Sequence, residues 1–140
     1  MSPSTLEHPL TRALLILTFT TGVIDAASFL GLGNVFTANM TGNVVLLGIG
    51  ISGVPELAIV GPLVSLAAFF LGSVVGGRMA AASPAEANRL SRSMQVEIGV
   101  LAAAAVWTLV VEIEPRHLSA DVAIALLAFA LGVRNATVRH

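Results

Sequence analysis

The residue with the clearest potential for chemistry is Asp25, a carboxylate within a long apolar stretch. The stretch begins at Ala13, so a helix would carry Asp25 about 18 Å into a hydrocarbon core roughly 30 Å thick. A carboxylate there is costly unless it faces protein or water, finds a partner or takes up a proton. Asp25 is therefore a candidate proton-coupling, cation-coupling or substrate-binding residue. The structural alternative is a helix cap, or a buried hydrogen bond to the next segment.

A second polar cluster follows, rich in Thr, Asn and Gly. Its members are Thr37, Asn39, Thr41, Gly42 and Asn43. If a half-helix begins near Thr37, its first amides and positive dipole end face the protein interior. The cluster would then bind a small polar or anionic solute, or line a water-filled path. Alternatively, these side chains cap the half-helix, pack against Asp25 or join helices. Gly42 would permit a close approach of backbone.

The other polar residues near the apolar segments give weaker signals. Glu97, Glu112 and Asp121 lie near segment ends, where we expect solvated carboxylates. We expect Arg134 to snorkel to the cytoplasmic side, or to pair with an acid in a complete protein. Trp107 lies mid-segment, so we expect it to pack inside the helix bundle.

Enzymatic and metal-dependent functions find no support in the sequence. Cys is absent, and the three histidines, His8, His117 and His140, lack ligand spacing. The sequence also has no nucleophile elbow, Walker loop, dinucleotide fingerprint or zinc-protease motif. We therefore expect no enzymatic activity, no cofactor and no bound metal.

The composition indicates the environment that these residues share. Hydrophobic residues make up 56% of the 140-residue chain, charged residues 11%, and the mean hydropathy is +0.91. Soluble domains carry about 25% charged residues, because most of a small domain's surface faces water. This excludes an ordinary cytosolic domain, a disordered chain and a nucleic-acid binder. The lipid bilayer is the expected partner, and the fold class is all-α and polytopic.

Hydropathy predicts four full spans and one short segment. The full spans are Ala13–Leu32, Leu57–Gly77, Met94–Ile113 and Leu118–Val138. The segment Asn34–Gly53 has only eight continuous apolar residues, Val44–Ile51, which cover about 12 Å as a helix. It is a weak full span and a good candidate for a re-entrant half-helix.

Arginine placement predicts the orientation of these spans. The polar stretch 78–93 holds three arginines and the C-terminal tail two. Both topologies for the segment 34–53 place the loop 78–93 and the C-terminus in the cytoplasm. Re-entry would add Arg12 to that side, giving six arginines against one, so this bias favours re-entry. Ser83 and the following Pro-Ala-Glu predict a short surface helix in the loop.

An internal repeat is suggested at a shift of 110 residues. Six of fourteen positions then match between 13–26 and 123–136, and Asp25 aligns with Asn135. The sequence predicts a single transmembrane domain over 1–140, with a first repeat core at 13–77 and a second repeat starting within 118–140. The chain would be a truncated version of a longer protein. Re-entry of 34–53 would make the repeats inverted, and a full span would make them parallel.

Two stretches resemble a known family. They are Gly22-Val-Ile-Asp-Ala-Ala-Ser-Phe-Leu30 and Phe36-Thr-Ala-Asn-Met-Thr-Gly-Asn43. Both are similar to the YoaK-like family of small bacterial inner-membrane proteins, which has no assigned activity, and Gly132-Val-Arg-Asn-Ala136 resembles the opening of that family's second half. The resemblance implies relatives of about six spans with an internal duplication, and it supplies no catalytic residues.

Two functional hypotheses follow. The first is a small-solute transporter or channel-like permease of the inner membrane, with Asp25 and the segment 37–43 in a central site. The second is a non-transporting assembly or regulatory protein. It would bind another helix through the small residues Ala68, Gly72 and Gly76, and a homo-oligomer is one form of this.

Overall fold

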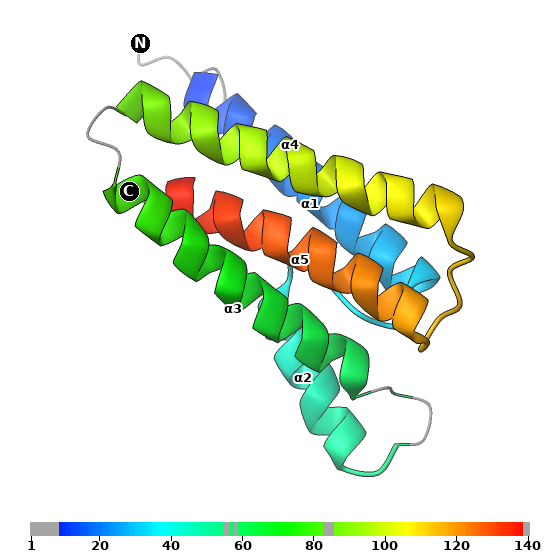
Figure 1. Cartoon of the computed structure of the whole chain (residues 1–140). Helices are drawn as coiled ribbons and strands as arrows, with labels where there is room; N and C mark the ends of the chain where they lie inside the picture. The colour runs from blue at the N-terminus through cyan, green and yellow to red at the C-terminus, as the bar shows by residue number, and fades with distance from the viewer. Residues whose placement is uncertain (1–8, 55–56, 58, 83–85, 139–140) are drawn as a thin grey trace.

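The computed structural model describes residues 9–54, 57, 59–82 and 86–138, which form five helices and no strand (Figure 1). The helices are α1 (Pro9–Gly31), α2 (Met40–Ile51), α3 (Val60–Ala81), α4 (Glu86–Val110) and α5 (Leu118–Val138). All but α2 contain an apolar stretch of 18 to 22 residues, enough to cross a membrane. The 12 residues of α2 reach only about 18 Å. The prediction of an all-α membrane protein with four full spans and one short helix is confirmed.

The helix ends differ from the predicted ones where polar residues continue an apolar helix. The stretch 78–93 is not all loop, because α3 continues into it and α4 begins within it. A helix satisfies its own backbone groups, so it runs on past the hydrocarbon core into the headgroup region. The predicted short surface helix is instead the start of α4, and Ser83 itself lies outside the described residues. The predicted span 94–113 also extends too far toward the C-terminus, since α4 ends at Val110.

The core is built around α5, which lies between α3 and α4 (Figure 1). Most of its buried side chains are small, and α3 and α4 can therefore approach closely on either side. These buried residues include Ala120, Ala123, Ala128 and Ala130. The bulkier Ile124, Leu131 and Val133 fill the remaining space, each at most 3% exposed.

Glycines bring α3 and α5 into backbone contact. A Cβ atom added at Gly72 would overlap the carbonyl group of Phe129, and one at Gly132 would overlap that of Phe69. Gly76 makes the same kind of approach to α5 one turn further along. The small-residue pattern of α3 therefore packs within this chain, so Gly72 and Gly76 are not a free surface for a second chain.

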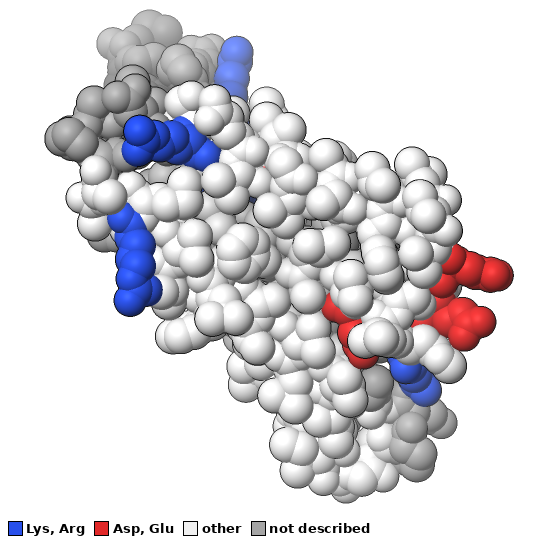
Figure 2. Space-filling view, in the orientation of Figure 1, with Lys and Arg blue, Asp and Glu red and all other residues white. Residues whose placement is uncertain are grey.

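Arginines gather at one end of the bundle, and acidic side chains gather at the other together with Arg116 (Figure 2). The first, which we call the arginine end, holds the start of α1, the end of α3, the start of α4 and the end of α5. The second, the acidic end, holds the opposite helix ends. At the acidic end Leu32, Gly61 and Asp121 line one small cavity, so the end of α1 and the starts of α3 and α5 meet there. Both described ends of the chain thus lie at the arginine end, as the re-entrant topology requires.

Helix α1 stands apart from the other three long helices. It makes almost no close backbone approach to them, and 11% of its apolar stretch is buried, the same share as in α4. Two cavities, of about 320 Å³ and about 260 Å³, separate it from α5. Its threonines Thr18, Thr20 and Thr21 donate their hydroxyl protons to carbonyls four residues earlier, at 2.7–2.8 Å. These bonds satisfy the hydroxyl protons without any partner from another helix.

Candidate functional site

The chain turns back into the bundle directly after α1. We call residues Leu32–Asn39, which join α1 to α2, the return segment. Gly33 (φ 96°) and Asn34 (φ 65°) adopt left-handed conformations, which Gly and Asn tolerate best. The Asn34 amide donates to the carbonyl of Phe29 at 3.0 Å, as in a Schellman helix end. The next residues therefore re-enter the protein instead of leaving at the acidic end.

Asp25 holds the return segment by its backbone. Its Oδ1 atom accepts hydrogen bonds from the amides of Thr37, at 2.9 Å, and Ala38, at 2.8 Å. Asp25 is 9% exposed and Thr37 is fully buried. Bonds between a carboxylate and backbone amides are charge-assisted, and here they offset the cost of burying the acid. The structure thus shows the hydrogen bond to the following segment that was the structural alternative for Asp25.

Asn43 holds the same segment from the other side. Its side-chain amide accepts a hydrogen bond from the Phe36 amide, at 3.0 Å, and donates to the Phe36 carbonyl, at 2.7 Å. It also donates to Ser65 on α3, at 3.0 Å, and the Ser65 hydroxyl donates to the Phe36 carbonyl at 2.7 Å. Non-helical backbone at membrane depth is tolerated only when its polar groups are satisfied within the protein. Asp25, Asn43 and Ser65 supply that satisfaction.

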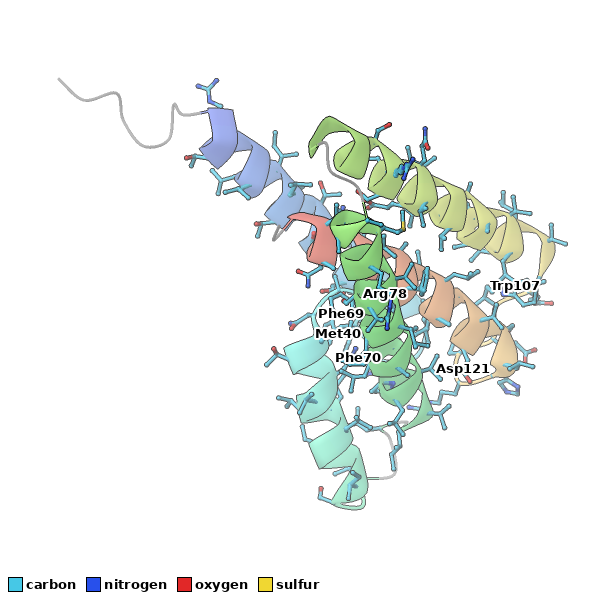
Figure 3. The ribbon with its side chains drawn as sticks, turned by 60° about the vertical axis from the view of Figure 1, so that its left-hand side comes forward. Met40, Phe69, Phe70, Arg78, Trp107 and Asp121 are labelled. Atoms are coloured by element: carbon cyan, nitrogen blue, oxygen red, sulfur yellow. The ribbon has the colours of Figure 1, made fainter. Side chains whose placement is uncertain are left out.

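Helix α2 begins later than the predicted start near Thr37. Asn39 is its N-cap and accepts from the Gly42 amide at 3.1 Å, so the first helical residue is Met40. Met40 lies beside α3, where its sulfur is 3.9 Å from the Ser65 hydroxyl oxygen (Figure 3). Residues Thr37–Asn39 belong to the return segment, because Asp25 fixes the amides of Thr37 and Ala38 in a non-helical arrangement.

Gly42 makes room for an aromatic ring and not for backbone. A Cβ atom there would lie 2.6 Å from the Phe36 ring, which also stacks on Phe29 with centroids 5.1 Å apart. The ring thus anchors the middle of the return segment. Thr41, the last of the predicted site residues, is exposed. The structure therefore brings Asp25, Thr37 and Asn43 together, and leaves Asn39 and Thr41 outside this buried network.

The larger of the two cavities beside α1 has a charged wall that the sequence pattern does not predict. We call it the α1–α5 cavity, and its volume is about 320 Å³. Its polar lining consists of Thr18 and Thr21 from α1 and Arg134 and Asn135 from α5. Apolar side chains and one residue of the return segment complete the wall, namely Leu14, Leu17, Ala38, Phe69 and Leu131.

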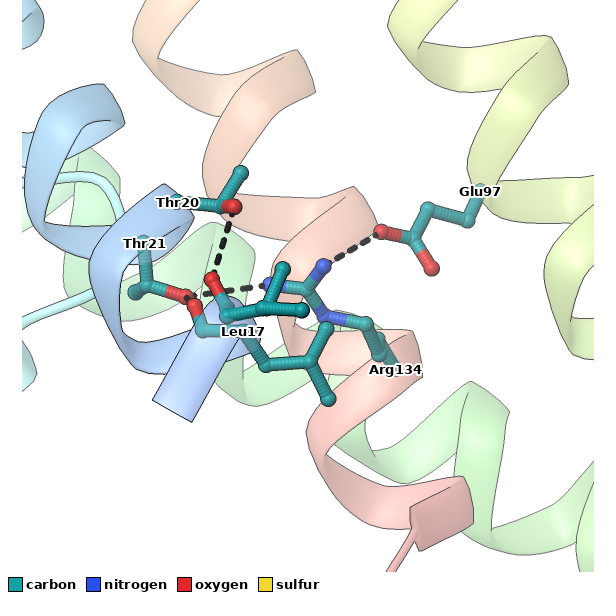
Figure 4. Close-up of polar contacts among 6 residues, drawn as sticks. Leu17, Thr20, Thr21, Glu97 and Arg134 are labelled. Carbon is teal, nitrogen blue, oxygen red and sulfur yellow. Dashed lines mark hydrogen bonds and ion pairs between the residues drawn. The ribbon is translucent and has the colours of Figure 1, made fainter. Parts of the chain in front are cut away.

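Arg134 connects three helices at this cavity (Figure 4). Its Nη1 lies 3.1 Å from Oε1 of Glu97 on α4, and its Nη2 donates to the Thr21 hydroxyl of α1 at 3.4 Å. The Glu97 side chain is only 13% exposed and that of Arg134 26%. The expectation of a solvated Glu97 is wrong, and Arg134 pairs within this chain instead of snorkelling.

A sequence signal for this ion pair exists but is indirect. Glu97 and Arg134 each lie inside an apolar helix, a few residues from the arginine end. An acid and a base at matching depth in antiparallel neighbouring spans tend to pair, because burial penalises each charge alone. Hydropathy does not show which faces of α4 and α5 meet, so the pairing required the structure.

The acidic end holds the other predicted polar residues. Asp121 lies in the first turn of α5 and Glu112 is exposed in the connection from α4. Trp107 lies one turn from the end of α4, at the same end as Asp121 (Figure 3). Its indole donates to the Ser119 carbonyl at 2.9 Å. Trp107 is therefore not mid-span as expected, because α4 ends earlier than hydropathy suggests.

Comparison with known proteins agrees with the resemblance seen in the motifs. A family model described as "Protein of unknown function (DUF1275)" matches residues 13–140. The chain belongs to this family. It is 28% identical over 128 residues to the UPF0700 transmembrane protein YoaK of Bacillus subtilis (strain 168), covering 90% of this chain and 55% of that protein. This DUF1275 chain thus spans about half the length of the relative. No solved structure matches it.

The structure gives the two motif stretches of this DUF1275 chain a common role. One carries Asp25 and the other carries Phe36, Thr37 and Asn43, which are the residues that bind or form the return segment. The spacing between the stretches is the length of chain needed to turn back from α1.

Proposed function

We propose that this DUF1275 chain is a permease for a small polar or ionic solute in the bacterial inner membrane, and not an enzyme. The observation that carries the proposal is the α1–α5 cavity. Arg134 is a charged side chain at membrane depth, inside the apolar stretch of α5, and it lines a space large enough for a small molecule. Ionisable groups at such positions mark substrate or ion pathways as a general rule.

The return segment supports the same proposal. Ala38 lines the cavity, and Asp25 binds the Ala38 amide, so the re-entrant chain forms part of the wall around the solute. Short helices preceded by non-helical backbone within the bilayer are recurrent features of transporter binding sites. In this proposal Asp25, Thr37 and Asn43 shape the site, while Arg134 provides its charge.

The proposed transporter architecture uses an inverted repeat. Helices α1 and α5 run in opposite directions, as inverted copies would. The sequence shift that aligns Asp25 with Asn135 also puts the two residues on these two helices. Asn135 lines the cavity, so the position equivalent to the acid of the first copy faces the proposed solute path. The arginine end is cytoplasmic in this proposal.

Solute uptake into proteoliposomes tests the proposal. Initial uptake rates of radiolabelled butyrate, glycine, glucose, urea and choline are compared with those of protein-free liposomes. We expect at least one solute to enter faster with the protein, and Leu17→Trp to abolish that excess by filling the α1–α5 cavity. Leu109→Trp is the matched control, because Leu109 is 85% exposed on α4. Uptake that equals the protein-free rate for every solute, or that Leu17→Trp leaves intact, overturns the proposal.

A further inference from the structure

The α5 wall of the α1–α5 cavity offers hydrogen-bond donors that the protein does not use up. A guanidinium group has five N–H donors. The contacts of Arg134 with Glu97 and Thr21 engage two of its nitrogens, once each. The side-chain amide of Asn135, the next residue, makes no hydrogen bond to another described residue. A ligand in the cavity therefore meets donors from Arg134 and Asn135 together.

The α1 wall offers acceptors only. The hydroxyl protons of Thr18 and Thr21 are directed to the carbonyls of Leu14 and Leu17 at 2.8 Å and 2.7 Å. Their oxygens can accept from a ligand but have no free proton to donate. An anionic group is therefore recognised at the α5 wall, where the positive charge also lies.

The rest of the wall is apolar, which limits the kind of anion that fits. Leu14, Leu17, Phe69 and Leu131 face the same space as Arg134. A volume of about 320 Å³ is at the small end of ligand sites. Burying a strongly hydrated phosphate or a sugar against four apolar side chains would leave polar groups unsatisfied. A carboxylate with a short apolar body satisfies both parts of the wall.

Glu97 is a carboxylate of this chain that contacts the guanidinium group of Arg134 from α4, and it is not among the residues that line the cavity. It contacts one guanidinium nitrogen of Arg134 through one oxygen, and not in the two-point geometry that carboxylates prefer with arginine. We propose that the α1–α5 cavity binds a small organic monocarboxylate, which bonds to Arg134 and Asn135 and competes with Glu97 for the guanidinium. This inference rests on the proposed function for its physiological role, but binding is measured without transport.

The test measures binding of radiolabelled benzoate to the purified 140-residue chain in a non-ionic detergent by equilibrium dialysis. Unlabelled benzoate and butyrate should compete, whereas the neutral benzamide and butyramide should not. Arg134→Lys should weaken binding by about tenfold, because it loses the planar donor pair while keeping the charge and the counter-ion of Glu97. Arg78→Gln, which changes an exposed arginine at the same end, should leave binding unchanged.

Two further variants separate binding from folding. Glu97→Gln removes the competing carboxylate and should tighten benzoate binding. The double variant Arg134→Gln/Glu97→Gln removes both charges, so it leaves no unpaired ion, and it should abolish binding while circular dichroism still shows the native helix content. Equal competition by benzamide and benzoate, or retained binding in a folded double variant, overturns the inference.

The outcomes for binding and for transport are distinguishable. Binding of benzoate and butyrate at Arg134, without uptake of butyrate or of any other solute, overturns the permease and leaves the carboxylate site standing. Uptake of glycine, urea or choline that depends on the cavity, without benzoate binding, overturns the carboxylate site and leaves the permease standing.

Discussion

At the scale of single residues, Asp25 shows how a buried acid within a membrane protein can serve to satisfy backbone amides. Its Oδ1 accepts two amides of the return segment, and neither amide has a helical partner in its place. Each buried donor left without an acceptor costs about 1–3 kcal/mol. The acid therefore stabilises a local fold whether or not it also takes part in transport.

Asp25→Ala should lower the free energy of unfolding by about 2 kcal/mol or more, because it leaves the amides of Thr37 and Ala38 unsatisfied. Asp25→Asn should cost less, since its amide oxygen can still accept. Circular dichroism during thermal unfolding in detergent measures both. Thr41→Ala is the control, as Thr41 is exposed and α2 has its cap elsewhere. A thermal midpoint that is equal for Asp25→Ala and Thr41→Ala would show that the carboxylate does not hold the segment.

The sequence identified this buried network better than it identified the charged cavity. Polar residues among apolar ones stand out in a linear pattern, so Asp25, Thr37 and Asn43 could be singled out. Their hydrogen-bond partners could not be predicted, because these partners are mostly backbone groups, which every residue has. The sequence predicts a solvated Glu97, and it leaves Arg134 either snorkelling or paired with an unnamed acid. The rotation of each helix about its axis decides whether such residues meet, and hydropathy does not give that rotation.

At the scale of elements, the contact between α3 and α5 depends on the absence of side chains. Gly72 and Gly132 each face a backbone carbonyl of the opposite helix. Between helices in lipid there is no hydrophobic driving force, so van der Waals contact and weak polar bonds hold them together. The Ser73 hydroxyl adds one such bond to the Gly132 carbonyl at 3.2 Å.

Gly72→Ala should therefore destabilise the protein by about 1–3 kcal/mol, because the added methyl group forces two backbones apart. Gly77→Ala is a matched control on the same helix, since its Cβ atom would meet nothing within 4 Å. It should be neutral or slightly stabilising, as alanine favours helix over glycine. Thermal unfolding midpoints of the two variants measure this difference. Equal midpoints would contradict the close contact between α3 and α5.

Hydropathy predicted the existence of every helix but not where each ends. The bounds of α5 matched because charged or polar residues flank both of its ends. Those of α3 and α4 did not, because arginine and glutamate continue a helix readily beyond the hydrocarbon core. The start of α2 was missed because Asn39, and not Thr37, caps it.

At the scale of the whole molecule, re-entry and charge distribution support one topology. The return segment brings the chain back to the acidic end at the close of α2, so α1 and α3 run in opposite directions. The sequence left open whether 34–53 spans the membrane. Arginine counts favoured re-entry, and the hydrogen bonds of Asp25 and Asn43 explain physically how it is stabilised. The internal repeat stays a prediction.

Single-cysteine labelling in intact bacteria and inverted vesicles tests this topology, and the chain has no native Cys to interfere. Cysteines at Asn34 and Ser52, on either side of α2, should react from the periplasmic face only. A cysteine at Ala82, after α3, should react from the cytoplasmic face only. Labelling of positions 34 and 52 from opposite faces would contradict re-entry, and labelling of all three from the reverse faces would contradict the orientation.

The crossing of α3 and α5 also has a consequence during biosynthesis. Ser73 and the Gly132 carbonyl that it contacts are 59 residues apart in the chain. At roughly 5–20 residues per second, α5 leaves the ribosome about 3–12 s after α3. During this interval the glycine face of α3 lacks the helix that it packs against in the finished protein. The hydrogen bonds that hold the return segment come from α1, α2 and α3, so they can form while α5 is still being translated.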